Sequence, residues 1–289
     1  MKEHLFSGVC TALVTPFIHN EVNYPMLKRL LARQIESGIK AVVVCGTTGE
    51  SPTLTDAEKL EIFKVSKEFV KDDCLIIAGT GSNSTQHAIE LSIRAQDAGA
   101  DALLIVSPYY NKATPDGLFT HYLSIDHCVS IPIILYNVPS RTGVDMPVSI
   151  YERLSKLPNI AGVKEANTDM TKITKIKNAC EHFDIWSGND DLAVPIISLG
   201  GCGVISVLSN LFPYEMRLMC DAALDGDFDS AAALQRKLQP MIELMFSEVN
   251  PIPVKAAMNQ IGFDCGPCRL PLCSPTQETL KKIQNLLLV

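Results

Sequence analysis

The chain has 289 residues, 47% hydrophobic and 20% charged, with a net charge of −7 and a pI near 5.4. This composition is typical of a folded protein with a sizeable core, and it leaves no basic stripe to neutralise phosphates, so we expect no nucleic-acid partner. The N-terminal residues lack a signal-like apolar core, and no run approaches the roughly 20 apolar residues that span a bilayer. We therefore expect a soluble, cytoplasmic protein with no membrane partner.

Ten cysteines are scattered along the chain, several within apolar runs, at positions 10, 45, 74, 128, 180, 202, 220, 265, 268 and 273. In a cytosolic chain this pattern favours free, mostly buried thiols over disulfides. Cys265-Gly-Pro-Cys268, with Cys273 nearby, could form a metal or redox motif. Neither a second CxxC pair nor a histidine pair accompanies it, so we favour ordinary thiols.

Short β-branched runs alternate with amphipathic segments along the chain. The first four predicted strands lie at 9–15, 41–45, 75–78 and 102–106. The helices predicted to follow them lie at 27–35, from Thr55, at 84–97 and from Pro115. The last four predicted strands lie at 131–136, 160–164, 183–187 and 204–207. Their helices lie at 149–157, 169–180 and 192–199 and from Pro213. The second helix opens with Thr55 and Glu58, which can form a capping box.

Eight strand–helix units in roughly 225 residues predict an α/β fold, a (β/α)8 TIM barrel. An open, doubly wound sheet is the rival, but it needs a glycine-rich fingerprint after the first strand, and residues 11–17 contain none. From about residue 227 the strand pattern stops, and 228–246, 253–261 and 275–288 are predicted helices. We therefore predict a catalytic barrel domain over 1–226 and a C-terminal three-helix domain over 227–289.

Lys164 ends the sixth predicted strand, where an apolar run gives way to polar residues. Most lysines at such places are ordinary edge or snorkelling residues. Burial, however, disfavours an ammonium group and so favours a nucleophilic amine. Active sites of (β/α)8 barrels lie at the carboxyl ends of the strands, so the residues at the other strand ends decide between these interpretations.

Hydroxyl groups and one arginine follow the other strands. Residues 46–50 read Gly-Thr-Thr-Gly-Glu, a tight turn whose amides can converge on a carboxylate. Tyr110 follows the fourth strand, Tyr136 ends the fifth, and Arg141 comes soon after. This set suits carbonyl chemistry, in which a lysine forms a Schiff base with a keto acid, tyrosines move protons and the arginine binds a second carboxylate.

The strand ends offer little to a metal ion. There is no His-x-His pair, and Asp190 and Asp191 stand alone, so we favour a helix N-cap role for them. The glycines of 200–203 lack an accompanying basic residue and favour a close-packing turn over a phosphate loop. We expect no metal and no cofactor.

These residues make the chain similar to the dihydrodipicolinate synthase family of pyruvate-dependent class I aldolases. The resemblance covers essentially the whole chain, including the helical tail. It rests on five motifs: Gly-Thr-Thr-Gly-Glu at 46–50, Pro-Tyr-Tyr-Asn at 108–111, Tyr-Asn-Val-Pro-Ser-Arg-Thr-Gly at 136–143, Gly-Val-Lys-Glu at 162–165 and Asn-Pro-Ile-Pro-Val-Lys at 250–255.

The resemblance implies a lyase that condenses pyruvate with L-aspartate 4-semialdehyde in lysine and diaminopimelate biosynthesis, with no cofactor beyond the covalent imine. It assigns the imine to the lysine, a proton relay to two tyrosines and a threonine, carboxylate binding to two threonines and an arginine, and pocket positions to Gly188 and Ile205. The imine-forming lysine is Lys164, and the proton relay consists of Tyr136, Thr47 and Tyr110. Thr47 and Thr48 would bind the pyruvate carboxylate, and Arg141 would bind that of the semialdehyde. It also implies a tetramer of tight dimers in which Tyr110 reaches the neighbouring site.

Two other functions stay open at this point. Sister enzymes that cleave N-acetylneuraminate or 2-keto-3-deoxy sugar acids share the lysine and tyrosine but typically lack an arginine at the position of Arg141. A non-catalytic sensor on the same barrel would not need Lys164, Tyr136 and Tyr110 together. Arg141 therefore favours aspartate semialdehyde as the acceptor.

One departure from the family concerns feedback by lysine. Lysine-inhibited members have two histidines after the Gly-Thr-Thr-Gly-Glu turn and a glutamate beyond the third strand. Here Asp56 and Lys59 stand in place of the histidines, and His87 replaces the glutamate, whereas Ser51, Asn83 and Tyr109 match the pocket. Because the ligand's ammonium loses its carboxylate partner, we predict weak or absent inhibition by lysine.

Overall fold

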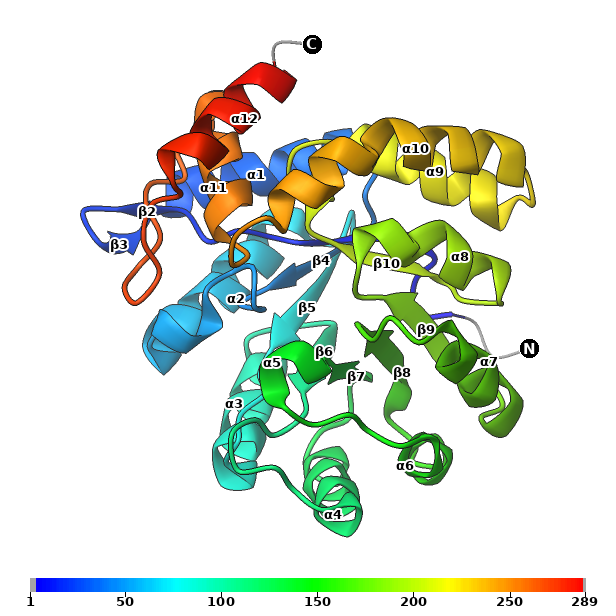
Figure 1. Cartoon of the computed structure of the whole chain (residues 1–289). Helices are drawn as coiled ribbons and strands as arrows, with labels where there is room; N and C mark the ends of the chain where they lie inside the picture. Colours follow the sequence, from blue (N-terminus) through cyan, green and yellow to red (C-terminus); the bar gives the residue numbers. More distant parts are fainter. Residues whose placement is uncertain (1–3, 288–289) are drawn as a thin grey trace.

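A computed structural model describes residues 4–287. Eight parallel strands close into a barrel in the order β1, β10, β9, β8, β7, β6, β5, β4 (Figure 1). These strands are β1 Gly8–Ala12, β4 Ala41–Val44, β5 Leu75–Gly79, β6 Ala102–Val106, β7 Ile133–Asn137, β8 Ile160–Glu165, β9 Asp184–Ser187 and β10 Gly203–Ser206. Closure comes from β1, which pairs with both β4 and β10. The predicted (β/α)8 barrel is confirmed, and the open sheet is excluded.

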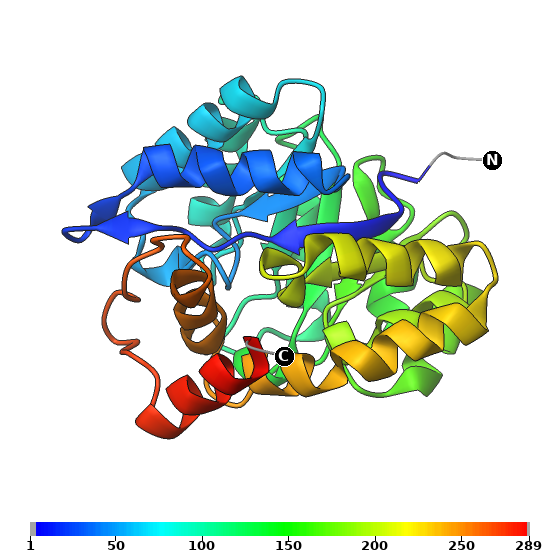
Figure 2. The ribbon, with the colours of Figure 1, turned by 90° about the horizontal axis from the view of Figure 1, so that it is seen from above.

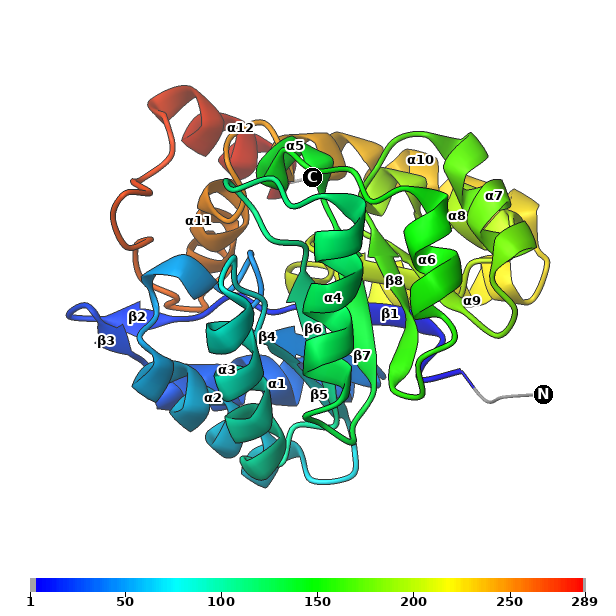
Figure 3. The ribbon, with the colours of Figure 1, turned by 90° about the horizontal axis from the view of Figure 1, so that it is seen from below.

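Helices surround the barrel, and α3, α4 and α6 stand side by side along part of it (Figure 3). The helices are α1 Tyr24–Glu36, α2 Asp56–Val70, α3 Thr85–Asp97, α4 Pro115–Asp126, α5 Pro139–Thr142, α6 Val148–Leu154, α7 Met170–Ala179, α8 Ala193–Ser198, α9 Pro213–Leu224, α10 Phe228–Met245, α11 Ile252–Gln260 and α12 Gln277–Leu287. Three short 3-10 turns lie at Ser51–Thr53 (η1), Asp190–Leu192 (η2) and Leu208–Asn210 (η3). The capping box at Thr55 and Glu58 is present as predicted.

The structure differs from the predicted elements at prolines and at very short segments. The first strand ends at Ala12 instead of 15, short of Pro16, and the fifth begins at Ile133 instead of 131, just past Pro132. Proline cannot donate to a strand ladder, so the later start of the fifth strand follows from the missing amide of Pro132. A hairpin of β2 Phe17–Ile18 and β3 Glu21–Val22 was not predicted, because two-residue strands leave no periodic pattern. The last predicted helix extended to residue 288, which lies outside the described residues.

Two apolar layers make up the core. The larger layer lies between the strands and the surrounding helices, and a smaller one fills the barrel interior with side chains such as Cys10, Ile134, Tyr136 and Ile205. At the amino-terminal end of the barrel, the rings of Phe6 and Trp186 stack 4.6 Å apart. Aromatic packing therefore fills that end of the barrel interior.

The C-terminal helices gather on one side of the barrel (Figure 2). There α10 lies along α9, and α11 contacts η3. Two ion pairs join this region to the barrel: Lys255 Nζ lies 2.6 Å from Glu50 Oε1, and Arg269 Nη2 lies 2.5 Å from Glu58 Oε1. The division at residue 227 stays a prediction, since these helices pack directly on the barrel helices.

The Glu58–Arg269 pair makes stability depend on pH. Hydrogen bonding to Arg269 lowers the pKa of Glu58 from 4.5 to about 2. Because the folded pKa is depressed, the stabilisation is present above about pH 4.5 and is lost as pH falls toward 2. We expect Glu58→Gln to cost about 2 kcal/mol near pH 7, and the difference from the wild type to shrink below pH 4.5.

Urea unfolding from about pH 7 to pH 3 measures this difference. Glu61→Gln is the matched control, because Glu61 is exposed on the same helix. A Glu58→Gln deficit that is the same at every pH would contradict the assignment.

Candidate functional site

Lys164 lies on β8 with its side chain inside the barrel. Its Cα is opposite those of Tyr136 on β7 and Trp186 on β9, and the residue is only 5% exposed. Its Nζ lies 4.5 Å from the centre of the Tyr136 ring. The predicted pairing of this lysine and tyrosine is therefore present, with the amine against an aromatic face and away from bulk water.

A cavity of about 450 Å³ opens at the carboxyl ends of the strands. Thr47, Tyr136 and Arg141 all line it. Lys164 is not on the cavity wall. Because the Tyr136 ring both lines the cavity and lies against the lysine amine, it connects the two.

The turn after β4 supplies polar groups to this cavity. Thr47 lines it, whereas Thr48 is 2% exposed and its Oγ1 accepts a hydrogen bond of 3.0 Å from Asn250 Nδ2. Within the described part of the chain, the amides of Thr47 and Thr48 donate to no other protein group. Such a turn can direct its amides to an anion, so the amides of Thr47 and Thr48 can contribute to binding a carboxylate.

The same turn is anchored by a buried ion pair. Glu50 has a left-handed backbone (φ 58°), and both its side chain and that of Lys255 are 1% exposed. The other carboxylate oxygen of Glu50 accepts the amide of Arg269 at 2.8 Å. A buried carboxylate with these partners is satisfied, so it holds the turn against the C-terminal region.

Arg141 lies at the mouth of the cavity. It is exposed on the short helix α5, and its Nη2 donates to the carbonyl of Asn250 at 3.3 Å. Its other guanidinium nitrogens have no protein partner among the described residues. A planar guanidinium so placed can bind a carboxylate that enters the cavity.

Three other predicted residues lie apart from the cavity wall. Tyr110 is 90% exposed with φ +71°, and does not line the cavity of its own chain. Ile205 is fully buried in the barrel interior, next to Cys10 across the β1–β10 ladder. Gly188 follows β9, where a Cβ would meet the Cβ of Ala166 at 2.6 Å, so glycine is required there by close packing.

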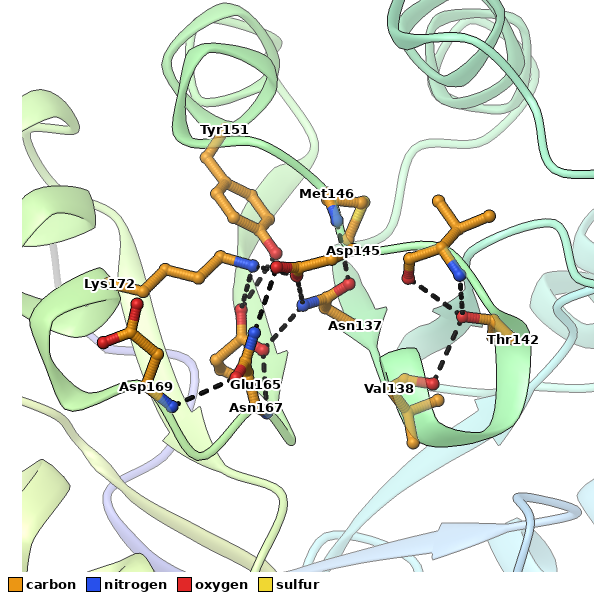
Figure 4. Close-up of polar contacts among 11 residues, drawn as sticks. Asn137, Val138, Thr142, Asp145, Met146, Tyr151, Glu165, Asn167, Asp169 and Lys172 are labelled. Carbon is orange, nitrogen blue, oxygen red and sulfur yellow. Dashed lines mark hydrogen bonds and ion pairs between the residues drawn. The ribbon is translucent and has the colours of Figure 1, made fainter.

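A buried polar network lies at the ends of β7 and β8 (Figure 4). Glu165 is fully buried and accepts hydrogen bonds from Asn137 Nδ2 at 2.7 Å and from the Tyr151 hydroxyl at 3.0 Å. Lys172 Nζ lies 3.4 Å from the same carboxylate and also pairs with Asp145. Successive side chains of a strand point to opposite faces, so Glu165 lies on the face of β8 opposite that of Lys164, and this network surrounds it there.

The network ties the loop that carries Arg141 to β8. Asn137 donates to both Glu165 and Asp145, and its side-chain oxygen accepts the amide of Met146 at 3.1 Å. Burial raises the pKa of Glu165, and the nearby charge of Lys172 opposes that rise. The positive charge of Lys172 therefore offsets the free-energy cost of burying the Glu165 carboxylate.

Asp190 has a different role from the predicted N-cap of its own helix. It is buried in η2, and its Oδ2 accepts the amides of Val207 and Leu208 at 3.1 and 2.9 Å, at the start of η3. Burial raises its pKa. Neither Asp190 nor Asp191 belongs to a group of metal-ligating side chains within residues 4–287.

The Cys265–Cys268 motif shows no sign of activation. All ten cysteines are free, as predicted, and burial raises the pKa of both Cys265 and Cys268 to about 12. Reactive thiols have depressed pKa values. Ordinary packing explains this pair.

A barrel closed at one end by aromatic rings, with a cavity and a buried lysine at the other, defines a (β/α)8-barrel enzyme. The family model described as the dihydrodipicolinate synthetase family matches residues 5–288. No helix among the described residues is long and apolar enough to cross a bilayer.

Curated relatives agree with the family model. A 4-hydroxy-tetrahydrodipicolinate synthase from Caldicellulosiruptor bescii is 49% identical over 282 residues, covering 96% of each chain. The Clostridium perfringens (strain SM101) protein of the same name is 46% identical over 277 residues, covering 96% of this chain and 95% of that one. A solved dihydrodipicolinate synthase from Cyanidioschyzon merolae, with lysine bound, is 38% identical with a TM-score of 0.96, covering 99% of this chain and 98% of that one.

The chain belongs to the dihydrodipicolinate synthetase family. The resemblance inferred from its motifs is confirmed, and so is the prediction that it is a lyase.

Removing Lys172 tests the network. Lys172→Met leaves the fully buried Glu165 carboxylate without its cation, so we expect a loss of about 3–5 kcal/mol in the free energy of unfolding at pH 7. Burial raises the folded pKa of Glu165, so this deficit shrinks as pH falls and the carboxylate is protonated.

Lys175→Met is the matched control, because Lys175 is exposed on the same helix. Denaturant unfolding at pH 7 and at pH 4.5 measures both variants. Equal stability of the Lys172 and Lys175 variants would show that the network does not support the fold.

Proposed function

We propose that the chain is a Schiff-base-forming synthase that condenses pyruvate with L-aspartate 4-semialdehyde to give 4-hydroxy-tetrahydrodipicolinate, in lysine and diaminopimelate biosynthesis. The observation that carries the proposal is the burial of Lys164 against Tyr136, beside a cavity lined by Thr47 and Arg141. The relatives named 4-hydroxy-tetrahydrodipicolinate synthase support the choice of this reaction.

In the first step, the amine of Lys164 attacks the keto carbon of pyruvate. The resulting carbinolamine loses water to form an imine, with Tyr136 and Thr47 passing the protons. The amides of the turn at 46–50 hold the pyruvate carboxylate. The positive imine then acts as an electron sink, so loss of a methyl proton gives an enamine.

In the second step, the enamine carbon attacks the aldehyde carbon of the semialdehyde, and the new alkoxide takes up a proton. The substrate's own amine then attacks the imine carbon and closes the ring, and Lys164 leaves as a free amine. One water is released overall. Arg141 binds the semialdehyde carboxylate at the mouth of the cavity, which orients the aldehyde toward the enamine.

The exposed Tyr110 fits an assembled enzyme. Within its own chain it lies away from the cavity, so its role in the relay requires a neighbouring subunit to receive it. We propose a homo-oligomer of at least two chains, consistent with a tetramer built from tight dimers.

Replacing Arg141 separates the two substrates. We expect Arg141→Leu to lower kcat/KM for aspartate semialdehyde by about 10- to 100-fold, because a charge-assisted hydrogen bond contributes about 1.5–3 kcal/mol. Imine formation with pyruvate should change little. Steady-state kinetics and borohydride trapping of the imine measure the two effects.

Arg153→Leu is the control, because that arginine is half-exposed and pairs with Asp116 away from the cavity. An equal loss of pyruvate trapping and of semialdehyde use in Arg141→Leu would contradict the acceptor assignment. Selective activity on sugar-derived aldehydes would point instead to the sister enzymes.

The wall of the cavity near α2 bears on lysine feedback. Ser51 and Tyr109 line it, together with Asp56, Lys59 and His87. Among the described residues that line the cavity, Asp56 is the only carboxylate, and its Oδ2 already lies 2.9 Å from His87 Nε2. Lys59 adds a buried cation. An ammonium ligand would meet a paired carboxylate and a like charge, so we propose weak or absent inhibition by lysine.

Titration of activity with L-lysine tests this proposal. The wild type should retain most of its activity at millimolar lysine, whereas His87→Glu should gain sensitivity because it places a second carboxylate beside Asp56. Strong inhibition of the wild type at sub-millimolar lysine would overturn the proposal.

A further inference from the structure

The opposite end of the barrel carries a second group of reactive side chains. A cavity of about 470 Å³ opens there, lined by residues that include His4, Asp184, Lys177 and His182. The N-terminal segment reaches this end beside β9 (Figure 1). Nothing in the proposed reaction uses this cavity, because Lys164 and Arg141 lie at the other end of the strands.

Beside this cavity, the side chains of His4 and Asp184, which line it, meet the buried side chain of Cys202. His4 comes from the N-terminal segment, Asp184 begins β9, and Cys202 lies just before β10. His4 Nδ1 lies 2.6 Å from Asp184 Oδ1, and Cys202 Sγ lies 3.5 Å from the former and 3.4 Å from the latter. One nitrogen, one oxygen and one sulfur therefore form a compact triangle.

These separations are close to those around a tetrahedral zinc ion. Zinc–nitrogen and zinc–oxygen bonds of about 2.0–2.1 Å and a zinc–sulfur bond of about 2.3 Å place sulfur about 3.6 Å from each light atom. The two measured sulfur distances already match. The nitrogen–oxygen distance would have to open to about 3.3 Å, which requires only that the hydrogen bond between His4 and Asp184 be exchanged for two metal bonds.

We propose that His4 Nδ1, Asp184 Oδ1 and Cys202 Sγ form a binding site for a divalent transition-metal ion of the zinc class. The mixed donor set suits a borderline-soft ion and not the oxygen-loving Mg²⁺ or Ca²⁺. Three protein ligands leave the fourth position of a tetrahedral ion to a water molecule. The thiol gives up its proton to solvent as the metal–sulfur bond forms.

Two features support a built site. Asp184 and Cys202 are 8% and 3% exposed, and the second carboxylate oxygen of Asp184 accepts the amide of Leu5 at 3.3 Å, which fixes the carboxylate and the segment that carries His4. A bound cation would offset the charge of the carboxylate that now faces this sulfur.

The bound ion would fasten the N-terminal segment across the end of the barrel. His4 belongs to the segment that leads to Phe6, whose ring stacks on Trp186 and whose carbonyl accepts the indole N–H at 3.2 Å. Metal binding would therefore stabilise the closed amino-terminal end of the barrel without touching the proposed reaction site.

Cobalt(II) titration of untagged, full-length protein tests the site directly. We expect one equivalent to bind with a thiolate-to-cobalt charge-transfer band, which Zn²⁺ displaces. Cys202→Ser should abolish the band, and His4→Gln should weaken binding by about 10-fold or more. Cys273→Ser is the matched control, because Cys273 is an exposed thiol in the C-terminal region, and it should leave the band unchanged.

Thermal unfolding supplies an independent readout. Zn²⁺ should raise the Tm of the wild type but not that of His4→Gln, a substitution at an exposed side chain that leaves folding intact. Absence of cobalt binding by the wild type, or a band that persists in both Cys202→Ser and His4→Gln, would overturn the proposal. Imine trapping on Lys164 should be the same in all of these variants, so failure of the metal site is distinguishable from failure of the proposed function.

Discussion

Closure of the barrel through β1 is the constraint on which the rest of the structure depends. The first strand pairs with β4 on one side and β10 on the other, so eight carboxyl ends surround one opening. This brings together Thr47, Tyr136 and Lys164, which are far apart in the chain. The stacked rings of Phe6 and Trp186 fill the opposite end, so the amine sits in a closed apolar barrel with access from one side.

Buried ion pairs at the carboxyl ends of the strands hold the loops that meet there when the barrel closes. Glu165 with Lys172 holds the ends of β7 and β8, and Glu50 with Lys255 holds the turn after β4. Each carboxylate also accepts backbone or side-chain hydrogen bonds, which makes its burial tolerable. Thr47 and Arg141 are thus carried on segments that several contacts hold in place, whereas Lys164 and Tyr136 lie on the strands themselves. This arrangement pre-organises the site for chemistry.

The sequence predicted what periodicity and strand-end position determine, namely the eight strands, the barrel and the placement of Lys164 beside Tyr136. It could not predict the partners of buried charges, because those are chosen by packing between distant segments. Lys172 did leave a signal, since it lies four residues before Ile176 on the apolar stripe of α7. The contact between the Thr48 hydroxyl and Asn250 depends on tertiary structure alone, and no local pattern indicates it.

The most direct test of the central claim is borohydride reduction in the presence of pyruvate, followed by peptide mapping. The account predicts a single pyruvate-dependent covalent adduct on Lys164, absent without pyruvate and absent in Lys164→Arg. The buried Lys172 and Lys255, held in ion pairs, should remain unmodified. An adduct on another lysine, or none in an enzyme that still turns over pyruvate and aspartate semialdehyde, would contradict it.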